Sequence, residues 1–251
     1  MDETGIMQTG WTDIGKKRYY FDMDGILQTG TVIIDKKTYE LDTDGSLKGY
    51  TPKKKSSKKK SSDKSATSDK SGTSTAKKSV ALTFDDGPSS FTDRLLDCLE
   101  ENNAKATFFM VGTEIASFPD EVKRMKKLGC ELGNHTYDHK DLATLSSDEI
   151  SSEIARVDEQ LVNLTGEGAS VVRPPYGSVN DTVKSTVGTP MILWSIDTLD
   201  WKTQDVESTV EEVMNNVKDG SIILMHDIFS TSVDAAEILI PQLIEEGYQL
   251  V

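Results

Sequence analysis

Residues 79–251 alternate between short apolar runs and longer segments in which apolar residues recur at helical spacing. The apolar runs have the length of strands, and polar residues directly follow most of them. Strands are predicted at 79–85, 105–112, 130–135, 171–175, 191–197 and 221–227, and helices at 89–103, 119–129, 146–166, 207–220 and 234–247; residues 248–251 close the chain. Ser146 and Glu149 have the spacing of a capping box, and Gly166 favours the end of that helix. This order predicts an α/β fold with parallel strands and outer helices.

Residues 1–50 follow a different pattern, which repeats every 20 residues. Gly5, Gly25 and Gly45 occupy equivalent positions, and each unit alternates apolar and polar residues around Asp-Gly or Thr-Gly turns. Alternation of this kind around tight turns is typical of β-hairpins. The fixed spacing predicts a small β-solenoid in which each hairpin covers the apolar face of its neighbour.

Residues 51–78 separate these two regions and contain no aromatic residue and no aliphatic residue larger than Ala. Their ten Lys and two Asp give a net charge of +8. Such a segment cannot bury enough surface to fold, so we expect a flexible tether of about 28 Å root-mean-square span. A solvated spacer is favoured over a tether that also adheres to anionic polymers.

Charge restricts the partners of the folded region. The chain of 251 residues has a net charge of −14, and residues 79–251 alone carry 12 basic and 31 acidic residues. So acidic a region argues against binding of nucleic acid through phosphate neutralisation. The sequence contains no apolar run of about 18 residues, so no transmembrane helix is predicted. No signal peptide is visible, and we expect the sequence to be part of a longer chain from which any export signal has been removed.

Two cysteines are present, Cys98 and Cys130. They lack the spacing of a metal site. Two buried thiols are favoured over a disulfide between them.

The three histidines of the chain are the first candidates for chemistry. His135 and His139 directly follow a predicted strand, and in a helix their spacing would place both rings on one face. Together with Asp86 they form a set of N and O donors that Zn²⁺ accepts, with a coordination position left for water. Asp85 neighbours Asp86 at a strand end and points to another side, where it can accept a proton from that water.

Five short motifs occur in order along residues 79–251: TFDDGP at 83–88, HTYDH at 135–139, RPPY at 173–176, DTLDW at 197–201 and ILMHD at 223–227. Together they resemble the motifs of the polysaccharide deacetylases, carbohydrate esterase family 4. The resemblance implies a distorted (β/α) barrel of about seven strands. Asp86, His135 and His139 correspond to the metal ligands of that family.

The same resemblance implies roles for the remaining motif residues. Asp85 corresponds to the general base, and Arg173 to the residue that pairs with it and lowers its pKa. His226 corresponds to the general acid, whose pKa Asp200 raises. The other positions implied are the oxyanion-binding N–H of Tyr176 and the walls of the acetyl pocket, Trp201 and Leu224.

The 20-residue units resemble the choline-binding or cell-wall-binding repeats of Gram-positive surface proteins. In that family, aromatic residues of neighbouring repeats enclose a quaternary ammonium group. Trp11, Tyr19 and Tyr20 are the candidates here, but the next unit has Thr31 and Glu40 where Trp11 and Tyr20 stand. Binding of choline or another wall polymer, and simple filling of the solenoid core, both stay open.

The combined resemblance implies a monomeric, extracellular, wall-associated hydrolase of linear amide bonds. We expect it to remove N-acetyl groups from N-acetylglucosamine in peptidoglycan with a divalent metal, Zn²⁺ before Co²⁺, Ni²⁺ or Fe²⁺. Chitin oligomers, N-acetylmuramic acid and O-acetylated xylan are alternative substrates. A wall-binding protein whose barrel has lost activity is the alternative of another class. The expected division is 1–50 for the repeats, 51–78 for the tether and 79–251 for the catalytic domain.

Overall fold

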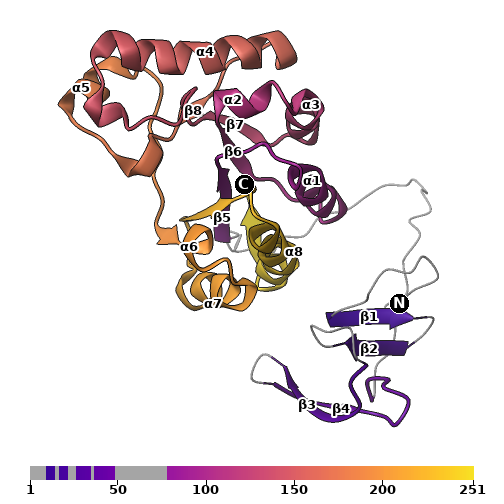
Figure 1. Ribbon diagram of the computed structural model, residues 1–251. Helices are drawn as coiled ribbons and strands as arrows, with labels where there is room; N and C mark the ends of the chain where they lie inside the picture. Colours follow the sequence, from indigo (N-terminus) through magenta and orange to yellow (C-terminus); the bar gives the residue numbers. More distant parts are fainter. Residues whose placement is uncertain (1–9, 15–16, 22–26, 35–36, 49–77) are drawn as a thin grey trace, which may run out of the picture. The chain divides into compact units, whose positions relative to one another are not determined.

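The computed structural model describes residues 10–14, 17–21, 27–34, 37–48 and 78–251 (Figure 1). The chain divides into two compact units, Met1–Ser71 and Gly72–Val251. Among the described residues, no helix combines the length and apolar character needed to cross a membrane.

The larger unit is built on a sheet of seven parallel strands. These are β5 (Lys78–Asp85), β6 (Thr107–Met110), β7 (Glu131–Asn134), β8 (Val171–Val172), β9 (Ile196–Asp197), β10 (Ser221–His226) and β11 (Tyr248–Leu250). Their order is β8-β7-β6-β5-β10-β9, and β11 pairs with the beginning of β5. The six predicted strands are therefore confirmed, although several are shorter than the apolar runs, and β11 is a strand that the sequence analysis did not predict.

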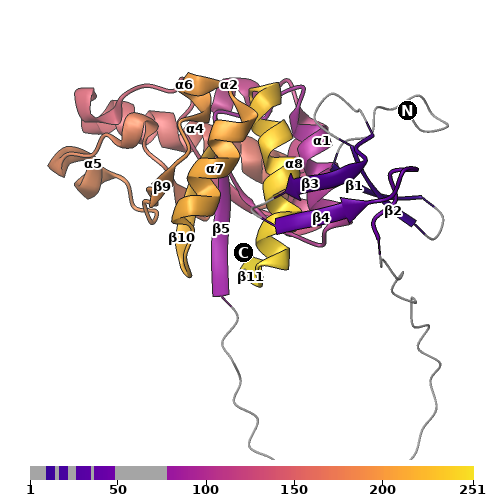
Figure 2. The ribbon, with the colours of Figure 1, turned by 90° about the horizontal axis from the view of Figure 1, so that it is seen from below.

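Helices lie around these strands (Figures 1 and 2). They are α1 (Thr92–Glu101), α2 (Gly112–Ile115), α3 (Pro119–Leu128), α4 (Ser147–Thr165), α5 (Asp181–Thr186), α6 (Asp200–Thr203), α7 (Val206–Asn216) and α8 (Ser230–Glu245). The predicted capping box of Ser146 and Glu149 is present, and Gly166 ends α4 in the left-handed conformation. Helix α8 begins four residues before the predicted start and includes Pro241.

The core forms where the strands meet these helices. Phe84 of β5 and Phe108 of β6 stack with ring centroids 5.5 Å apart, and both are fully buried. Apolar side chains of α1 and α8 complete this cluster, among them Leu95, Leu99 and Leu239. Cys98 and Cys130 are free thiols, as the sequence favoured.

The segment between β8 and β9 gives the sheet its barrel character. Met191 pairs with Val172 of β8 in an isolated parallel bridge, and Ile196 pairs with Ile223 of β10. One segment therefore contacts both ends of the strand order, which confirms the expected distorted barrel. The strand predicted at 191–197 is interrupted because the carbonyls of Ile192 and Leu193 accept hydrogen bonds from Arg173 instead of from a strand.

The smaller unit contains two antiparallel hairpins. The first pairs β1 (Gly10–Ile14) with β2 (Lys17–Phe21), and the second pairs β3 (Gly30–Ile34) with β4 (Lys37–Leu41). Corresponding strands begin 20 residues apart, as the repeat predicts. Ser46 pairs with Tyr19 and Leu47 with Leu41, so the third repeat connects the two hairpins.

Candidate active site

The predicted catalytic residues meet at the carboxyl ends of the parallel strands. Asp85 ends β5, His226 ends β10, and the two are register partners. His135 directly follows β7, and Arg173 directly follows β8. Because all of these strands are parallel, their polar ends lie at one edge of the barrel, where β/α barrels carry their sites.

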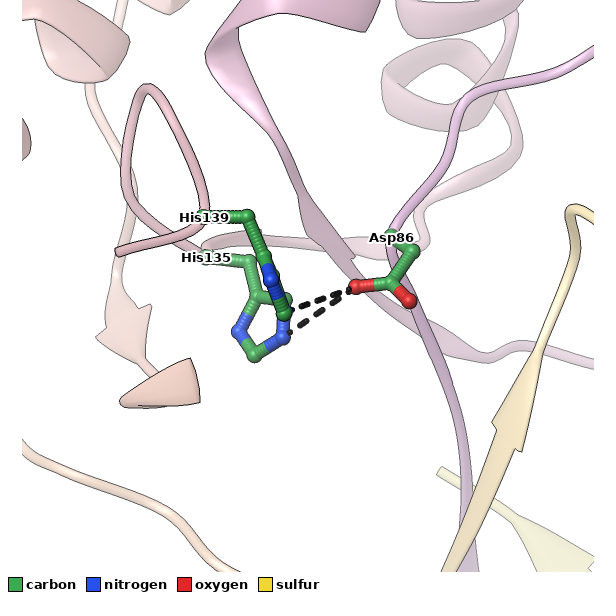
Figure 3. A group of neighbouring side chains, drawn as sticks. All are labelled: Asp86, His135 and His139. Atoms are coloured by element: carbon green, nitrogen blue, oxygen red, sulfur yellow. Dashed lines mark ion pairs between the residues drawn. The ribbon is translucent and has the colours of Figure 1, made fainter. Parts of the chain in front are cut away.

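Asp86, His135 and His139 form a group that can hold a metal ion (Figure 3). Asp86 Oδ1 lies 3.4 Å from His135 Nε2 and 3.2 Å from His139 Nε2, and the three donor atoms all lie within 4.8 Å of one another. A tetrahedral ion with bonds of about 2.1 Å places its ligands about 3.4 Å apart. Asp86 Oδ1 is also buried without a hydrogen-bond partner among the described residues. A divalent cation therefore fits this group.

The environment of His135 suits a metal ligand. Its Nδ1 lies 2.6 Å from the carbonyl oxygen of Arg173, which can only accept, so Nδ1 carries the proton. Burial lowers the pKa of His135 to about 3, so the ring is neutral near pH 7. The lone pair of Nε2 is consequently available on the side of Asp86.

The segment that carries both histidines is a loop and not a helix. Thr136 and His139 have φ angles of 69° and 53°, and Asp86 and Tyr176 have φ angles of 72° and 60°. The helical reading of the four-residue spacing is therefore wrong, because left-handed residues bring the two rings together instead, with centroids 5.0 Å apart. Left-handed backbone in non-glycine residues is costly and gathers at functional sites.

Glu153 of α4 holds this loop in place. Its Oε2 accepts hydrogen bonds from the N–H groups of Tyr137 (3.0 Å) and Asp138 (2.8 Å), and its Oε1 lies 2.9 Å from Lys140 Nζ. The side chain is buried on the apolar face of α4. The sequence analysis missed Glu153, although an acidic residue in the helical series Ile150, Glu153, Val157 was the available signal.

We expect Glu153→Ala to weaken Zn²⁺ binding by about 10-fold or more, because positioning residues beside metal ligands typically contribute that much. The substitution leaves two loop N–H groups without their acceptor. Titration against a chromogenic chelator measures the affinity. Glu159→Ala, at an exposed position of the same helix, is the matched control. Equal affinities of the two variants would contradict the positioning role.

Asp85 and Arg173 form a buried ion pair beside the metal group. Arg173 Nη1 lies 2.6 Å from Asp85 Oδ1, and Asp85 Oδ2 lies 3.6 Å from His135 Nε2. Burial raises the pKa of Asp85 to about 6, and the charge of Arg173 offsets this rise only in part. Arg173 does lower this pKa, as the sequence indicates, but the net shift is upward, because desolvation of the carboxylate outweighs the nearby guanidinium.

Asp200 orients His226 and favours its protonated form. Its Oδ1 lies 2.8 Å from His226 Nδ1, and its Oδ2 accepts the N–H of His226 at 2.8 Å. Burial acts to lower the pKa of His226, but the hydrogen bond and charge of Asp200 outweigh it, so the pKa is raised. This direction agrees with the sequence expectation and favours the protonated ring.

We expect Asp200→Asn to move the alkaline limb of the kcat profile to lower pH. Protonated His226 is the form that donates, and without the carboxylate it loses its proton at a lower pH. Initial rates over about pH 5–10 locate the limb, since the ordinary pKa of histidine is about 6.5. Asp205→Asn removes the same charge at the start of α7 and should leave the limb unmoved. An unshifted limb in Asp200→Asn would refute this assignment.

Tyr176, Trp201 and Leu224 are the remaining predicted site residues of this unit. The ring of Tyr176 lies 4.9 Å from that of His139, and no hydrogen bond of the described residues uses the Tyr176 N–H. Trp201 follows Asp200 and is about half exposed, while Leu224 is buried on β10 two residues before His226. Tyr176 thus lies at the metal group, and Trp201 and Leu224 lie beside the His226–Asp200 pair.

A pocket of about 360 Å³ opens beside the metal group. Its lining residues are Asp86, Val111, Thr113, Glu114, Asp138, His139 and Ile228. None of Tyr176, Trp201 and Leu224 belongs to this lining, so their substrate contacts stay predictions.

The candidate residues of the repeats lie on one hairpin of the smaller unit. Trp11 is the register partner of Tyr20, and Thr12 is the partner of Tyr19. Tyr19 and Tyr20 are consecutive in β2, so their side chains leave the strand on opposite faces. One hairpin therefore cannot present both tyrosines to the same ligand, and the ligand site stays a prediction.

Comparisons with known proteins agree with this site. Residues 72–189 match the polysaccharide deacetylase family, and residues 8–48 match the choline-binding repeat. The peptidoglycan-N-acetylmuramic acid deacetylase PdaC of Bacillus subtilis is 41% identical over 70% of this chain. The peptidoglycan-N-acetylglucosamine deacetylase PgdA of Listeria monocytogenes is 39% identical over 69%. This chain spans 38% of the length of each of these two relatives.

Solved structures extend the match to the fold. The structure described as "T48 deacetylase with substrate" is 43% identical, with a TM-score of 0.68 over 70% of this chain and 88% of that one. The structure of PdaC from Bacillus subtilis is 41% identical, with a TM-score of 0.68 over 70% of this chain and 87% of that one. The chain therefore belongs to the polysaccharide deacetylases, the metal-dependent hydrolases of carbohydrate esterase family 4.

Proposed function

We propose that this protein removes the N-acetyl group from N-acetylglucosamine residues of peptidoglycan and releases acetate. The observation that carries the proposal is the buried Asp85–Arg173 pair between the Asp86, His135 and His139 group and the His226–Asp200 pair. A proton acceptor, a cation site and a charged proton donor at one edge of the barrel suit amide hydrolysis.

In this proposal Asp86, His135 and His139 hold the metal. When bound there, a divalent ion, Zn²⁺ by the donor set, supplies Lewis-acid polarisation and lowers the pKa of water. Asp85 accepts the proton of the water that attacks the acetamide carbonyl, and Arg173 keeps the acceptor oriented. The free N–H of Tyr176 donates to the oxygen that becomes negative.

The departing nitrogen must gain a proton, since an unprotonated amine is a poor leaving group from a tetrahedral carbon. His226, protonated and oriented by Asp200, donates this proton. The carbon–nitrogen bond then breaks, and acetate and a free amino sugar leave. Trp201 and Leu224, beside His226, are the proposed contacts for the acetyl methyl group.

The wider setting follows from the two matched regions. The names of the relatives place N-acetylmuramic acid and N-acetylglucosamine of peptidoglycan among the substrates of this family. We therefore propose an extracellular, wall-associated monomer with repeats at 1–50, a tether at 51–78 and a catalytic domain at 79–251. The repeats would bind choline or another wall polymer, with Trp11, Tyr19 and Tyr20 as candidates.

Acetate release tests the proposal. The zinc-loaded full chain is incubated with N-acetylglucosamine oligomers and with peptidoglycan, and acetate is measured with and without a chelator. We expect release from both substrates that the chelator stops. Parallel assays with N-acetylmuramic acid glycans and acetylated xylan distinguish the alternative substrates. No acetate from any of them, with stoichiometric metal bound, would overturn the proposal.

A further inference from the structure

Asp227, the residue after His226, has no part in the chemistry described above, yet it is fully buried. Its Oδ2 accepts a hydrogen bond from Thr92 Oγ1 (2.5 Å), and its carbonyl oxygen accepts one from Ser89 Oγ (2.6 Å). Ser89 N–H in turn donates to Thr92 Oγ1 at 2.7 Å. Both the backbone and the side chain of Asp227 are therefore tied to the turn that follows Asp86.

Gly87, the residue after Asp86, packs directly on the Asp227 carboxyl group. A Cβ added at Gly87 would overlap Asp227 Oδ1 and would lie 2.6 Å from its Cγ. Asp227 Oδ1 has no hydrogen-bond partner among the described residues. Its close neighbour is the backbone of Gly87, against which it packs. The carbonyl of Gly87 also accepts the N–H of Val111 at 2.9 Å, which restrains the turn from the other side.

The Asp86–Gly87 turn and the end of β10 carry Asp86 and His226, which must keep a fixed distance from each other. Asp86 precedes Gly87 and belongs to the metal group, while His226 precedes Asp227 and ends β10. Any shift of the Gly87 backbone moves the adjacent Asp86 relative to His135 and His139. Ligand distances near 3.2–3.4 Å leave little room for such a shift.

We propose that Asp227 is a positioning residue that holds the Asp86–Gly87 turn against the end of β10. It thereby sets the distance between the metal group and the proton donor His226. The inference rests on the proposed metal-dependent deacetylase function. It predicts that changes at Asp227 affect Zn²⁺ affinity and kcat, and leave KM for the glycan within about twofold.

A double-mutant cycle on the full chain tests the packing. Zn²⁺ affinity is measured by chelator competition for the wild type, Gly87→Ala, Asp227→Ala and the double variant. We expect Gly87→Ala to weaken binding about 10-fold or more. In the double variant the new methyl group occupies space left by the carboxyl group, so it should bind zinc no more weakly than Gly87→Ala alone. Losses that simply multiply would overturn the inference.

Matched controls separate positioning from a general loss of structure. Gly188→Ala adds a methyl group where nothing lies within 4 Å, and Asp219→Ala removes a carboxylate that accepts the Ser79 N–H at the other end of β5. Both should keep wild-type zinc affinity. Asp227→Ala with the same affinity as Asp219→Ala would contradict the proposal.

Milder variants keep the test decisive if Asp227→Ala does not fold. Asp227→Asn retains the shape and an oxygen acceptor for Thr92, so zinc affinity and kcat should stay near wild type. Thr92→Val removes the hydroxyl that donates to Asp227 and accepts from the Ser89 N–H, and it should weaken zinc binding by about threefold. Wild-type affinity in Thr92→Val would count against the inference, whereas a wild type that binds no zinc or releases no acetate would overturn the proposed function itself.

Discussion

Replacement of Asp86 by alanine is expected to weaken Zn²⁺ binding by more than about 100-fold, beyond the range found when residues behind a metal ligand are changed. Asp86 is the only anionic member of the described metal group, and both histidine rings face its Oδ1. Without it, only the two imidazoles remain as ligands, and acetate release should fall to the background rate. Metal analysis of the purified variant and chelator competition measure the loss.

Glu114→Ala is the matched control for Asp86→Ala. Glu114 lines the same pocket and carries the same charge but does not belong to the metal group. It should keep stoichiometric zinc and most of the activity. Stoichiometric zinc at wild-type affinity in Asp86→Ala would show that the metal group is wrongly assigned.

Asp85→Asn is expected to lower kcat by about 10²–10⁴-fold, the usual contribution of a general base. Zinc should stay bound, because Asp86, His135 and His139 are unchanged. The amide keeps the shape of the side chain but cannot accept the proton of the attacking water. Steady-state acetate release at saturating zinc, with metal content measured on the same sample, checks both statements.

The same substitution also leaves Arg173 buried without its anionic partner. Removal of one member of a buried pair costs about 3–5 kcal/mol, so unfolding by denaturant should show a lower stability. Folding must therefore be verified at the assay temperature before rates are compared. A folded, zinc-bound Asp85→Asn variant within about tenfold of wild-type kcat would exclude Asp85 as the base.

Asp85 and Asp86 show which properties of a site can be predicted from local sequence. The sequence predicts that adjacent carboxylates at a strand end serve different purposes, and the structure agrees: Asp85 faces Arg173 while Asp86 faces the histidines. The pKa of Asp85 could not be predicted in the same way. Its direction depends on how completely the side chain is buried, and burial depends on packing among segments distant along the chain.

Regular elements were largely predictable because their signals are local. The capping box of Ser146 and Glu149 acts within one helical turn, and the 20-residue period places β3 and β4 twenty residues after β1 and β2. The apolar runs mark the strands, and the polar residues after them mark the catalytic edge. The five motifs indicate the candidate metal ligands and the candidate acid and base through residue type and order alone.

Residues that only position others could not be found this way. In the sequence, Glu153 is one more acidic residue of a helix. The contact between Asp227 and Ser89 joins residues 138 positions apart in the chain. Arg173 interrupts a predicted strand by taking the carbonyls of Ile192 and Leu193. The sequence by itself thus determined most strands and helices, the parallel direction of the strands and the candidate site residues, because periodicity and motif chemistry are local. Only the tertiary structure decided the loop conformation of the histidines, the direction of the Asp85 pKa and the supporting contacts, because burial and close packing arise from segments that meet only in the folded chain.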